Sequence, residues 1–180
     1  MKTRLPVVPT IAAIVLIPTF LALGYWQLQR AEEKRVLQAE YDRRALGPPT
    51  HLGATPQAAE ALRFRQIVAT GRYRPEHQVL IDNRVHRGVA GYHVVTPLQL
   101  EHSANHVLVN RGWVALGSDR QHLPTIDTPA GVVTVSGVAT VPHEAGFRLG
   151  ETESPTQPVW QHLDIERYAR RLGAPLQPIV

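Results

Sequence analysis

The chain has 180 residues, of which 43% are hydrophobic and 19% are charged, a composition typical of a globular protein rather than a disordered one. It contains no cysteine, which excludes disulfides, thiolate metal sites, cysteine nucleophiles and iron–sulfur clusters. The formal net charge is +4, yet no basic run is interleaved with aromatic residues and no zinc-finger or RNA-binding pattern occurs, which argues against nucleic acid as a partner.

The first predicted element is the stretch 5–29, which contains no Asp, Glu, Lys, Arg or His. At about 1.5 Å per residue, a helix of this length crosses a hydrocarbon core of about 30 Å. A cleavable signal peptide is the alternative, because residues 22–24 have the small-residue spacing of a cleavage site. The apolar stretch is longer than a signal core, so we predict a transmembrane helix over 5–29 after a short N-terminus, 1–4.

Residues 30–49 are predicted to continue the helix out of the membrane and to end it at Gly47-Pro48-Pro49. Two basic residues precede the apolar stretch, whereas five follow it closely: Arg30, Lys34, Arg35, Arg43 and Arg44. Counted literally, the positive-inside rule favours a cytoplasmic domain. Nearby acidic residues dilute the pattern, and charge alone leaves the orientation open.

Residues 50–180 are predicted to form one β-rich domain. Thr55 and Pro56 suggest the start of a short helix that ends before Arg63. Short β-branched segments separated by turn residues then indicate strands over 64–73, 79–84, 92–96, 98–100, 106–116 and 132–141. Asp164 and Gly173 are placed to cap a late helix, and 176–180 resembles a last strand. The predicted fold class is α+β: an N-terminal transmembrane helix followed by an antiparallel sheet or partly closed barrel with a few short helices.

The nine histidines raise the question of a metal site. His102 and His106 are four residues apart, a spacing that would place both on one face of a helix. Residues 101–105, however, have the pattern of a turn between two strands, and we predict no metal ligands. The sequence also lacks a nucleophile elbow, a zinc-protease motif, a P-loop and a dinucleotide fingerprint, so we predict no catalytic residue and no enzyme.

Two Asn-Arg dipeptides, Asn83-Arg84 and Asn110-Arg111, each follow an apolar β-segment and precede a glycine. Arginine at a strand end pairs readily with a carboxylate of the protein or of a ligand. The structural interpretation is a salt bridge to Asp82, Asp119 or another acid. The functional interpretation is an anion site, such as one for haem propionates, and under it the candidate contacts are Arg30, Arg84 and Arg111.

Four segments in this order and spacing resemble the surfeit locus protein 1 family of cytochrome c oxidase assembly factors, in a bacterial form: 23–30 (LGYWQLQR), 91–98 (GYHVVTPL), 107–114 (VLVNRGWV) and 160–165 (WQHLDI). The resemblance marks a set of positions for fold maintenance or partner contact: Gly24, Trp26, Gln27, Arg30, Gly91, Tyr92, Thr96, Pro97, Asn110, Arg111, Gly112, Trp113 and Trp160.

The resemblance implies a membrane-anchored, non-enzymatic assembly factor of the respiratory chain in the bacterial inner membrane. Its N-terminus would be cytoplasmic and residues 50–180 periplasmic. Its partner would be subunit I of an aa-type oxidase, with haem a synthase as a neighbour. Haem a would be the cofactor handled by the complete protein. In the family a second transmembrane helix, which carries the histidine proposed to ligate haem, follows the position of Val180; the sequence ends before it, so no residue here inherits that role.

Two other functions remain in view. One is a periplasmic copper metallochaperone using the histidines, and the other is an adaptor that binds only proteins.

Overall fold

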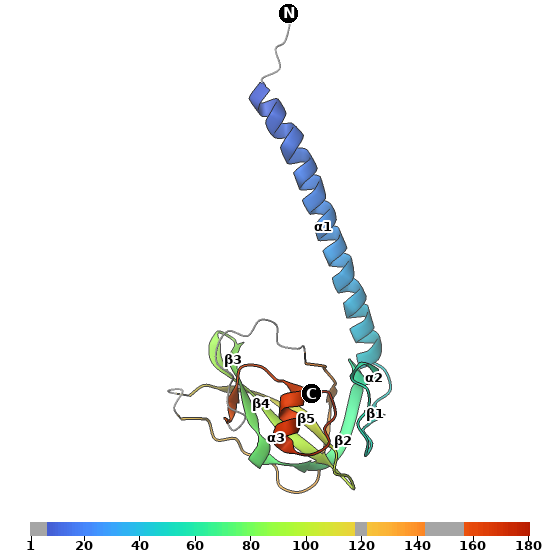
Figure 1. Ribbon diagram of the computed structural model, residues 1–180, viewed down its shortest axis with the longest axis vertical. Coiled ribbons are helices and arrows are strands. Elements are labelled where there is room, and N and C mark those ends of the chain that lie inside the picture. Colours follow the sequence, from blue (N-terminus) through green and yellow to red (C-terminus); the bar gives the residue numbers. More distant parts are fainter. Residues whose placement is uncertain (1–6, 118–121, 143–156) are drawn as a thin grey trace, which may run out of the picture. The chain divides into compact units, whose positions relative to one another are not determined.

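The computed structural model describes residues 7–117, 122–142 and 157–180 of the chain, drawn in colour in Figure 1. The predicted N-terminus 1–4 and Asp119, one candidate partner of the arginines, lie outside these ranges. The chain divides into two units, Met1–Arg43 and Arg44–Val180. Each unit is described by itself below.

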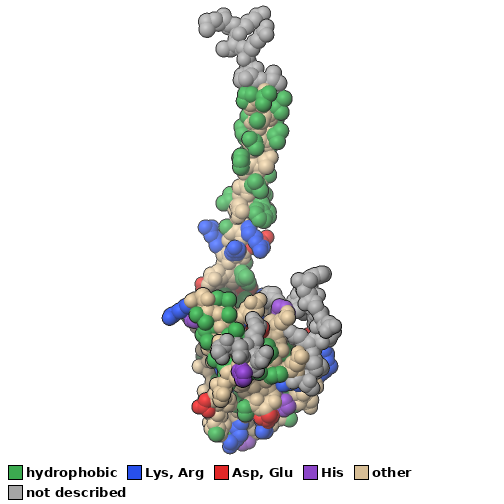
Figure 2. Space-filling view, turned by 90° about the vertical axis from the view of Figure 1, so that its left-hand side faces the viewer, with side chains coloured by type: hydrophobic (Ala, Val, Ile, Leu, Met, Phe, Trp, Pro, Cys, Tyr) green, Lys and Arg blue, Asp and Glu red, His purple; other side chains and the backbone are tan. Residues whose placement is uncertain are grey.

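The first unit consists of most of helix α1, Val7–Ala45. Its 39 residues amount to about 58 Å of helix. The helix is long and apolar enough to cross a membrane, and the large apolar side chains of its first half are exposed. Figure 2 shows these hydrophobic side chains covering that stretch, followed by Lys and Arg side chains. The predicted helix, including its continuation beyond residue 30, is therefore present in the structure.

The second unit contains one seven-stranded sheet with short helices, which confirms the α+β class. The strands are β1 (Thr50–His51), β2 (Gln66–Tyr73), β3 (Val79–His86), β4 (Val89–Leu100), β5 (His106–Ala115), β6 (Val133–Val138) and β7 (Val159–Trp160). The helices are α2 (Ala59–Leu62), the 3-10 turn η1 (Pro75–His77) and α3 (Ile165–Leu172). Most pairings are antiparallel; the short β1–β2 and β3–β7 pairings are parallel. The sheet is not closed into a barrel.

Strand β4 is the centre of the sheet. It pairs with β5 along one side, while on the other side β3 pairs with its first half and β2 with its last residues. The sequence predicts separate strands over 92–96 and 98–100, with a break at Pro97. That expectation is wrong, because β4 runs unbroken through Pro97. The Pro97 carbonyl accepts a hydrogen bond from Arg74 N. The nitrogen and the carbonyl of one strand residue face the same side, so the Pro97 nitrogen faces the point where the partner of β4 changes from β3 to β2. No N–H is needed there for strand pairing.

Helix α3 covers part of the sheet. Asp164 accepts a hydrogen bond from Arg167 N at its start, and Gly173 ends it with φ +65°, both as predicted. Tyr168 from this helix is buried against Trp160 and the strand residues Val79, Ile81 and Val95. A second cluster, which includes Leu98 and Val107, lies between β2, β4, β5 and β6. The packing of α3 explains why its short sequence stays helical.

Two local predictions need correction. The helix expected from Thr55 is only α2, which starts at Ala59 after an Ala58 N-cap that forms no side-chain hydrogen bond. The carbonyl of Thr55 instead accepts a hydrogen bond from buried Gln177. The strand expected over 176–180 is not a named strand: Leu176 forms an isolated bridge with His106. Val180 exchanges two backbone hydrogen bonds with Thr140 instead.

Candidate functional site

Both Asn-Arg dipeptides lie at β-bulges on the two sides of β4. The β3–β4 register shifts between Ile81 and Arg84, and the β4–β5 register shifts between His93 and Val95, opposite the segment 110–113. Asn83 (φ +58°) and Gly112 (φ +106°) supply the left-handed backbone that these bulges use. The repeated motif therefore marks two bulges that re-aim the side chains of neighbouring strands.

Trp113 packs directly on the backbone of Gly91 across the β4–β5 pair. A β-carbon on Gly91 would lie 2.6 Å from the Trp113 ring and 2.2 Å from the Val114 carbonyl oxygen. The indole Nε1 donates to the Arg84 carbonyl at 3.0 Å, and the ring centroid lies 5.4 Å from that of His86. The indole thus connects β3, β4 and β5 on one face, which explains why glycine is needed at position 91.

His93 lies between the two bulges. Its Nδ1 is 3.4 Å from Asn110 Nδ2, and Asn110 Oδ1 accepts a hydrogen bond from Gly112 N at 3.0 Å. Burial lowers the pKa of His93 below its ordinary value, and the nearby Arg84 charge lowers it further. His93 therefore prefers its neutral form, able to accept or donate a hydrogen bond.

The two motif arginines have different environments. The Arg111 guanidinium donates to Gln78 Oε1 (3.4 Å), to Thr128 Oγ1 (2.7 Å) and to the Asp127 carbonyl, and it lies 5.1 Å from the centre of the Tyr73 ring. Among the described residues these partners are uncharged, and Asp119 lies outside them, so the salt bridge to an acid stays a prediction. Burial raises the pKa of the Tyr73 phenol, an effect that the Arg111 charge opposes.

Arg84 is exposed, and within the described ranges its guanidinium makes no hydrogen bond or ion pair. It lies beside the tip of the β3–β4 hairpin, whose turn is Arg87-Gly88, with φ +50° and +80°. Val85 and Val89 at this tip are 67% and 52% exposed. Arg84, Val85, His86, Val89 and Trp113 are named the hairpin-tip surface. It combines a free cation, aromatic rings and apolar side chains, which suits binding of a protein segment or an anion.

Several other predicted residues are buried parts of the fold. Thr96 Oγ1 donates to the same Gln78 Oε1 that Arg111 reaches, at 2.9 Å. Tyr92 is in a core cluster with Leu80. Trp160 is fully buried, donates to the Gln157 carbonyl and lies under the Arg167 guanidinium at 4.1 Å from its ring centre. These contacts explain the residues structurally.

The remaining predicted residues, Gly24, Trp26, Gln27 and Arg30, lie on α1 in the first unit and are exposed. Arg30 is committed to an exposed ion pair with Glu33 at 3.0 Å. A β-carbon at Gly24 would meet no atom within 4 Å. Within this unit, the four residues present one solvent-accessible stretch of helix.

Among the described residues the structure shows no cluster of potential metal ligands. No three His, Asp or Glu side chains gather among them. His102 lies in a turn at φ +55°, whereas His106 is buried with Nδ1 3.4 Å from the Pro175 carbonyl oxygen, so the two do not share a helix face. The pocket between β5 and β6 is lined without any His, Met, Tyr or charged residue and offers no axial ligand for haem iron.

Sequence reasoning missed Gln78, Val85 and Val89. Gln78 accepts from both Arg111 and Thr96, a role that depends on contacts between distant strands. Val85 and Val89 fell in the predicted connection 85–91. The Arg87-Gly88 dipeptide between β-branched residues was the signal that would have indicated a tight hairpin with an exposed tip.

The fold defines the class as an α+β protein that combines an open sheet domain with one helix long and apolar enough to cross a membrane. The model of the SURF1 family matches residues 14–180, so the chain belongs to the SURF1 family. It is 26% identical over 162 residues to the cytochrome oxidase assembly protein SHY1 of Saccharomyces cerevisiae, covering 86% of this chain and 42% of the yeast protein.

Two further relatives give the same assignment. Identity is 27% to surfeit locus protein 1 of Mus musculus, covering 89% of this chain and 57% of the mouse protein. It is 27% to a SURF1-like protein of Rickettsia bellii, covering 98% of this chain and 69% of that protein. The chain therefore spans about half the length of the yeast and mouse relatives.

Proposed function

We propose that this protein is a membrane-anchored assembly factor for an aa-type cytochrome c oxidase and that it assists insertion or stabilisation of haem a in subunit I. The observation that carries the assembly role is the family match over 14–180, together with the yeast relative named for cytochrome oxidase assembly. The apolar helix α1 supports a location in the membrane, for which the bacterial inner membrane with the domain in the periplasm is proposed.

The hairpin-tip surface is the proposed contact with the oxidase. Arg84 brings a positive charge without a partner in the described ranges, and Val85 and Val89 bring exposed apolar area. A membrane-protein client offers both carboxylates and apolar segments, which match this combination. Arg111 is not part of the proposed contact because its guanidinium is held by Gln78, Thr128 and Asp127.

A protein-only adaptor is the second candidate, in which subunit I or haem a synthase is bound without any contact to haem. The described residues favour it in one respect, since the apolar pocket contains no residue that ligates iron. The two candidates differ in whether the haem a content of the oxidase depends on this protein.

The experiment that tests both is deletion of the gene in its native host. Membranes are solubilised, and haem a content and cytochrome c oxidase activity are measured per unit of subunit I protein. The proposal expects subunit I that is present but deficient in haem a and weakly active, with rescue by the restored gene. Reduced subunit I with a normal haem a content would favour the adaptor. Normal haem a and normal activity, in a host without a second copy of the gene, would contradict the assembly role.

A further inference from the structure

The last residues of the chain connect the free edges of β5 and β6. His106 N donates to the Pro175 carbonyl at 2.9 Å, and Gln177 N donates to the His106 carbonyl at 2.8 Å. Further along, Thr140 and Val180 exchange two backbone hydrogen bonds of 2.8 and 2.9 Å. An extended segment of the chain itself therefore already lies between the edges of β5 and β6 along part of their length. The gap between these two edges is named the β5–β6 seam.

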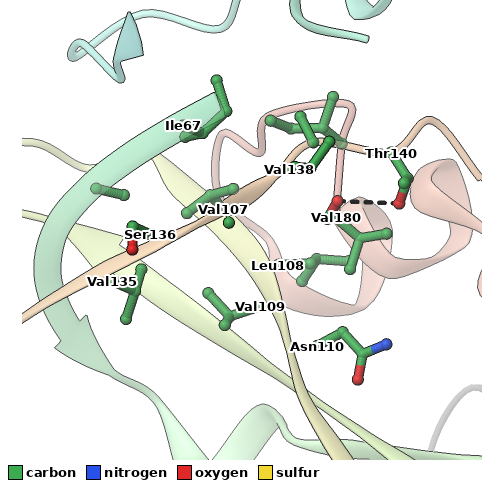
Figure 3. A pocket seen from close by; sticks show the side chains of 14 residues that line it. Ile67, Val107, Leu108, Val109, Asn110, Val135, Ser136, Val138, Thr140 and Val180 are labelled. Carbon is green, nitrogen blue, oxygen red and sulfur yellow. Dashed lines mark hydrogen bonds between the residues drawn. The ribbon is translucent and has the colours of Figure 1, made fainter. Parts of the chain in front are cut away.

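Beyond this bridge the seam opens into a pocket of about 330 Å³. Its walls come from β2, β5, β6 and the chain end, and Figure 3 shows Ile67, Val107, Val109, Val135 and Val180 around it. The lining contains no charged residue. The occupant that fits is therefore uncharged and largely apolar.

The backbone of β6 directs alternate groups into the seam. The backbone N–H and C=O of Ala139 face the β2 side, where they bond to the Arg65 carbonyl and to Phe64 N. The N–H and C=O of residue 140 face the opposite side, where they bond to Val180. Because backbone direction alternates along a strand, Val138 and Ser136 also point outward. In the portion of the chain that the structure describes, these outward N–H and C=O groups have no partner.

Strand β5 presents the same arrangement from the other side. His106 bonds outward to the chain end, so Leu108, two residues later, directs its N–H and C=O outward too. Leu108 is only 1% exposed, and among the described residues its outward groups have no partner. Backbone groups at buried positions are normally paired, so this edge favours an occupant with a peptide backbone over a hydrocarbon chain.

We propose that the β5–β6 seam binds an extended, uncharged polypeptide segment of a partner protein as an added β-strand, with an apolar side chain in the pocket. Ile179 of the chain itself is the precedent, since it is 1% exposed and packs in the cluster beside the pocket. Edge-strand addition draws its affinity from main-chain hydrogen bonds and its selectivity from side-chain pockets. The strand edges and the pocket carry this proposal, and they would bind such a segment whether or not the partner protein is the oxidase.

The probe is a fluorescent peptide alternating valine and threonine between terminal lysines, added to the full chain in lipid nanodiscs. Its matched control is the same peptide with N-methylated backbone amides, which cannot pair with a strand edge. Amide hydrogen exchange is read residue by residue. Binding should slow exchange at Ser136 and Val138, whose amides point into the seam, and should leave Val135 and Gly137 unchanged because theirs already pair with β2.

The blocking variant is Gly137→Leu. Gly137 lines the pocket, and a β-carbon there meets no atom within 4 Å, so the position has room for a side chain to begin at the pocket wall. The matched control is Gly53→Leu, another glycine with open space, which does not line the pocket. We expect Gly137→Leu to weaken binding of the probe by roughly tenfold or more and Gly53→Leu to leave it unchanged.

Alternating protection together with selective loss of binding in Gly137→Leu supports the proposal. Binding that the N-methylated peptide reproduces, or that protects odd and even positions alike, would overturn it in favour of a simple apolar ligand. Absence of binding by the probe to the folded chain would also overturn it, and neither result would touch the deletion experiment on the oxidase.

Discussion

Trp113 and Gly91 are in direct contact across two strands, the indole ring occupying the space that a β-carbon at position 91 would need. The Nε1 hydrogen bond to the Arg84 carbonyl fixes the ring from the third strand. This relationship links the glycine of one family-like segment to the tryptophan of another, and it orders the surface on which Arg84 and His86 lie.

Gly91→Ala should destabilise the domain by about 1–3 kcal/mol, because the new methyl group meets both the indole and the Val114 carbonyl oxygen. Urea unfolding of the full chain in detergent, followed by tryptophan fluorescence, measures this. Gly137→Ala is the matched control, since that strand glycine has open space around it, and it should change the free energy of unfolding by less than about 0.5 kcal/mol. Equal effects of the two substitutions would contradict the close packing of Trp113.

Arg111→Lys should cost about 1–3 kcal/mol of stability, because lysine cannot reach Gln78, Thr128 and Asp127 together. Arg84→Lys, the equivalent change in the other Asn-Arg dipeptide, should stay within about 0.5 kcal/mol, because Arg84 is exposed. Thermal unfolding of the two variants side by side checks the difference. An Arg111→Lys variant with unchanged stability would show that these contacts do not hold the 127–128 segment.

Acidification should destabilise the domain through His106. Burial lowers the pKa of His106 below its ordinary value of 6.5, although hydrogen bonds to Pro175 and Ala104 partly oppose the shift. Below about pH 6.5 the unfolded chain binds a proton that the folded chain does not, so the free energy of unfolding falls as pH falls toward the folded pKa. This contribution is fully present above pH 6.5. The pKa of His93 is also lowered, so His93 too makes the free energy of unfolding fall as the pH falls.

His106→Gln should therefore reduce the loss of stability between pH 7.5 and pH 5.5, measured by urea unfolding at each pH. The part due to His93 should remain, and His93→Gln in the same background should reduce it further. An unchanged pH dependence in the double variant would contradict the assignment to these two histidines.

The hairpin tip should matter for function more than for folding. Val85→Thr with Val89→Thr should leave the unfolding free energy within about 0.5 kcal/mol, because both side chains are largely exposed. In the deletion host, this double variant should restore less oxidase activity than the unaltered gene at equal protein level. Leu123→Thr, at a residue 39% exposed outside this surface, is the matched control and should restore full activity. Full rescue by the tip variant would remove the hairpin tip from the proposed contact.

The local elements were predictable because their signals are local. The uncharged run in α1 forms its hydrogen bonds within itself, and α3 has its Asp164 and Gly173 caps within the same short segment. The β-branched segments likewise indicated β2 to β6, with the boundaries of β4 and β6 misplaced by a few residues. The two-residue strand β7 was not predicted, since its pairing with β3 depends on distant residues.

The sequence by itself determined the apolar helix, the α+β class and the family, since each depends on periodicity, composition or motif order. Only the tertiary structure decided that Arg111 is held by Gln78 and Thr128, whereas Arg84 has no such partner among the described residues. It also decided that Pro97 lies within the central strand and that the chain end bridges β5 and β6. The physical reason is that these outcomes depend on partners far apart in sequence, and strand order and bulges, which no local pattern encodes, determine which partners meet.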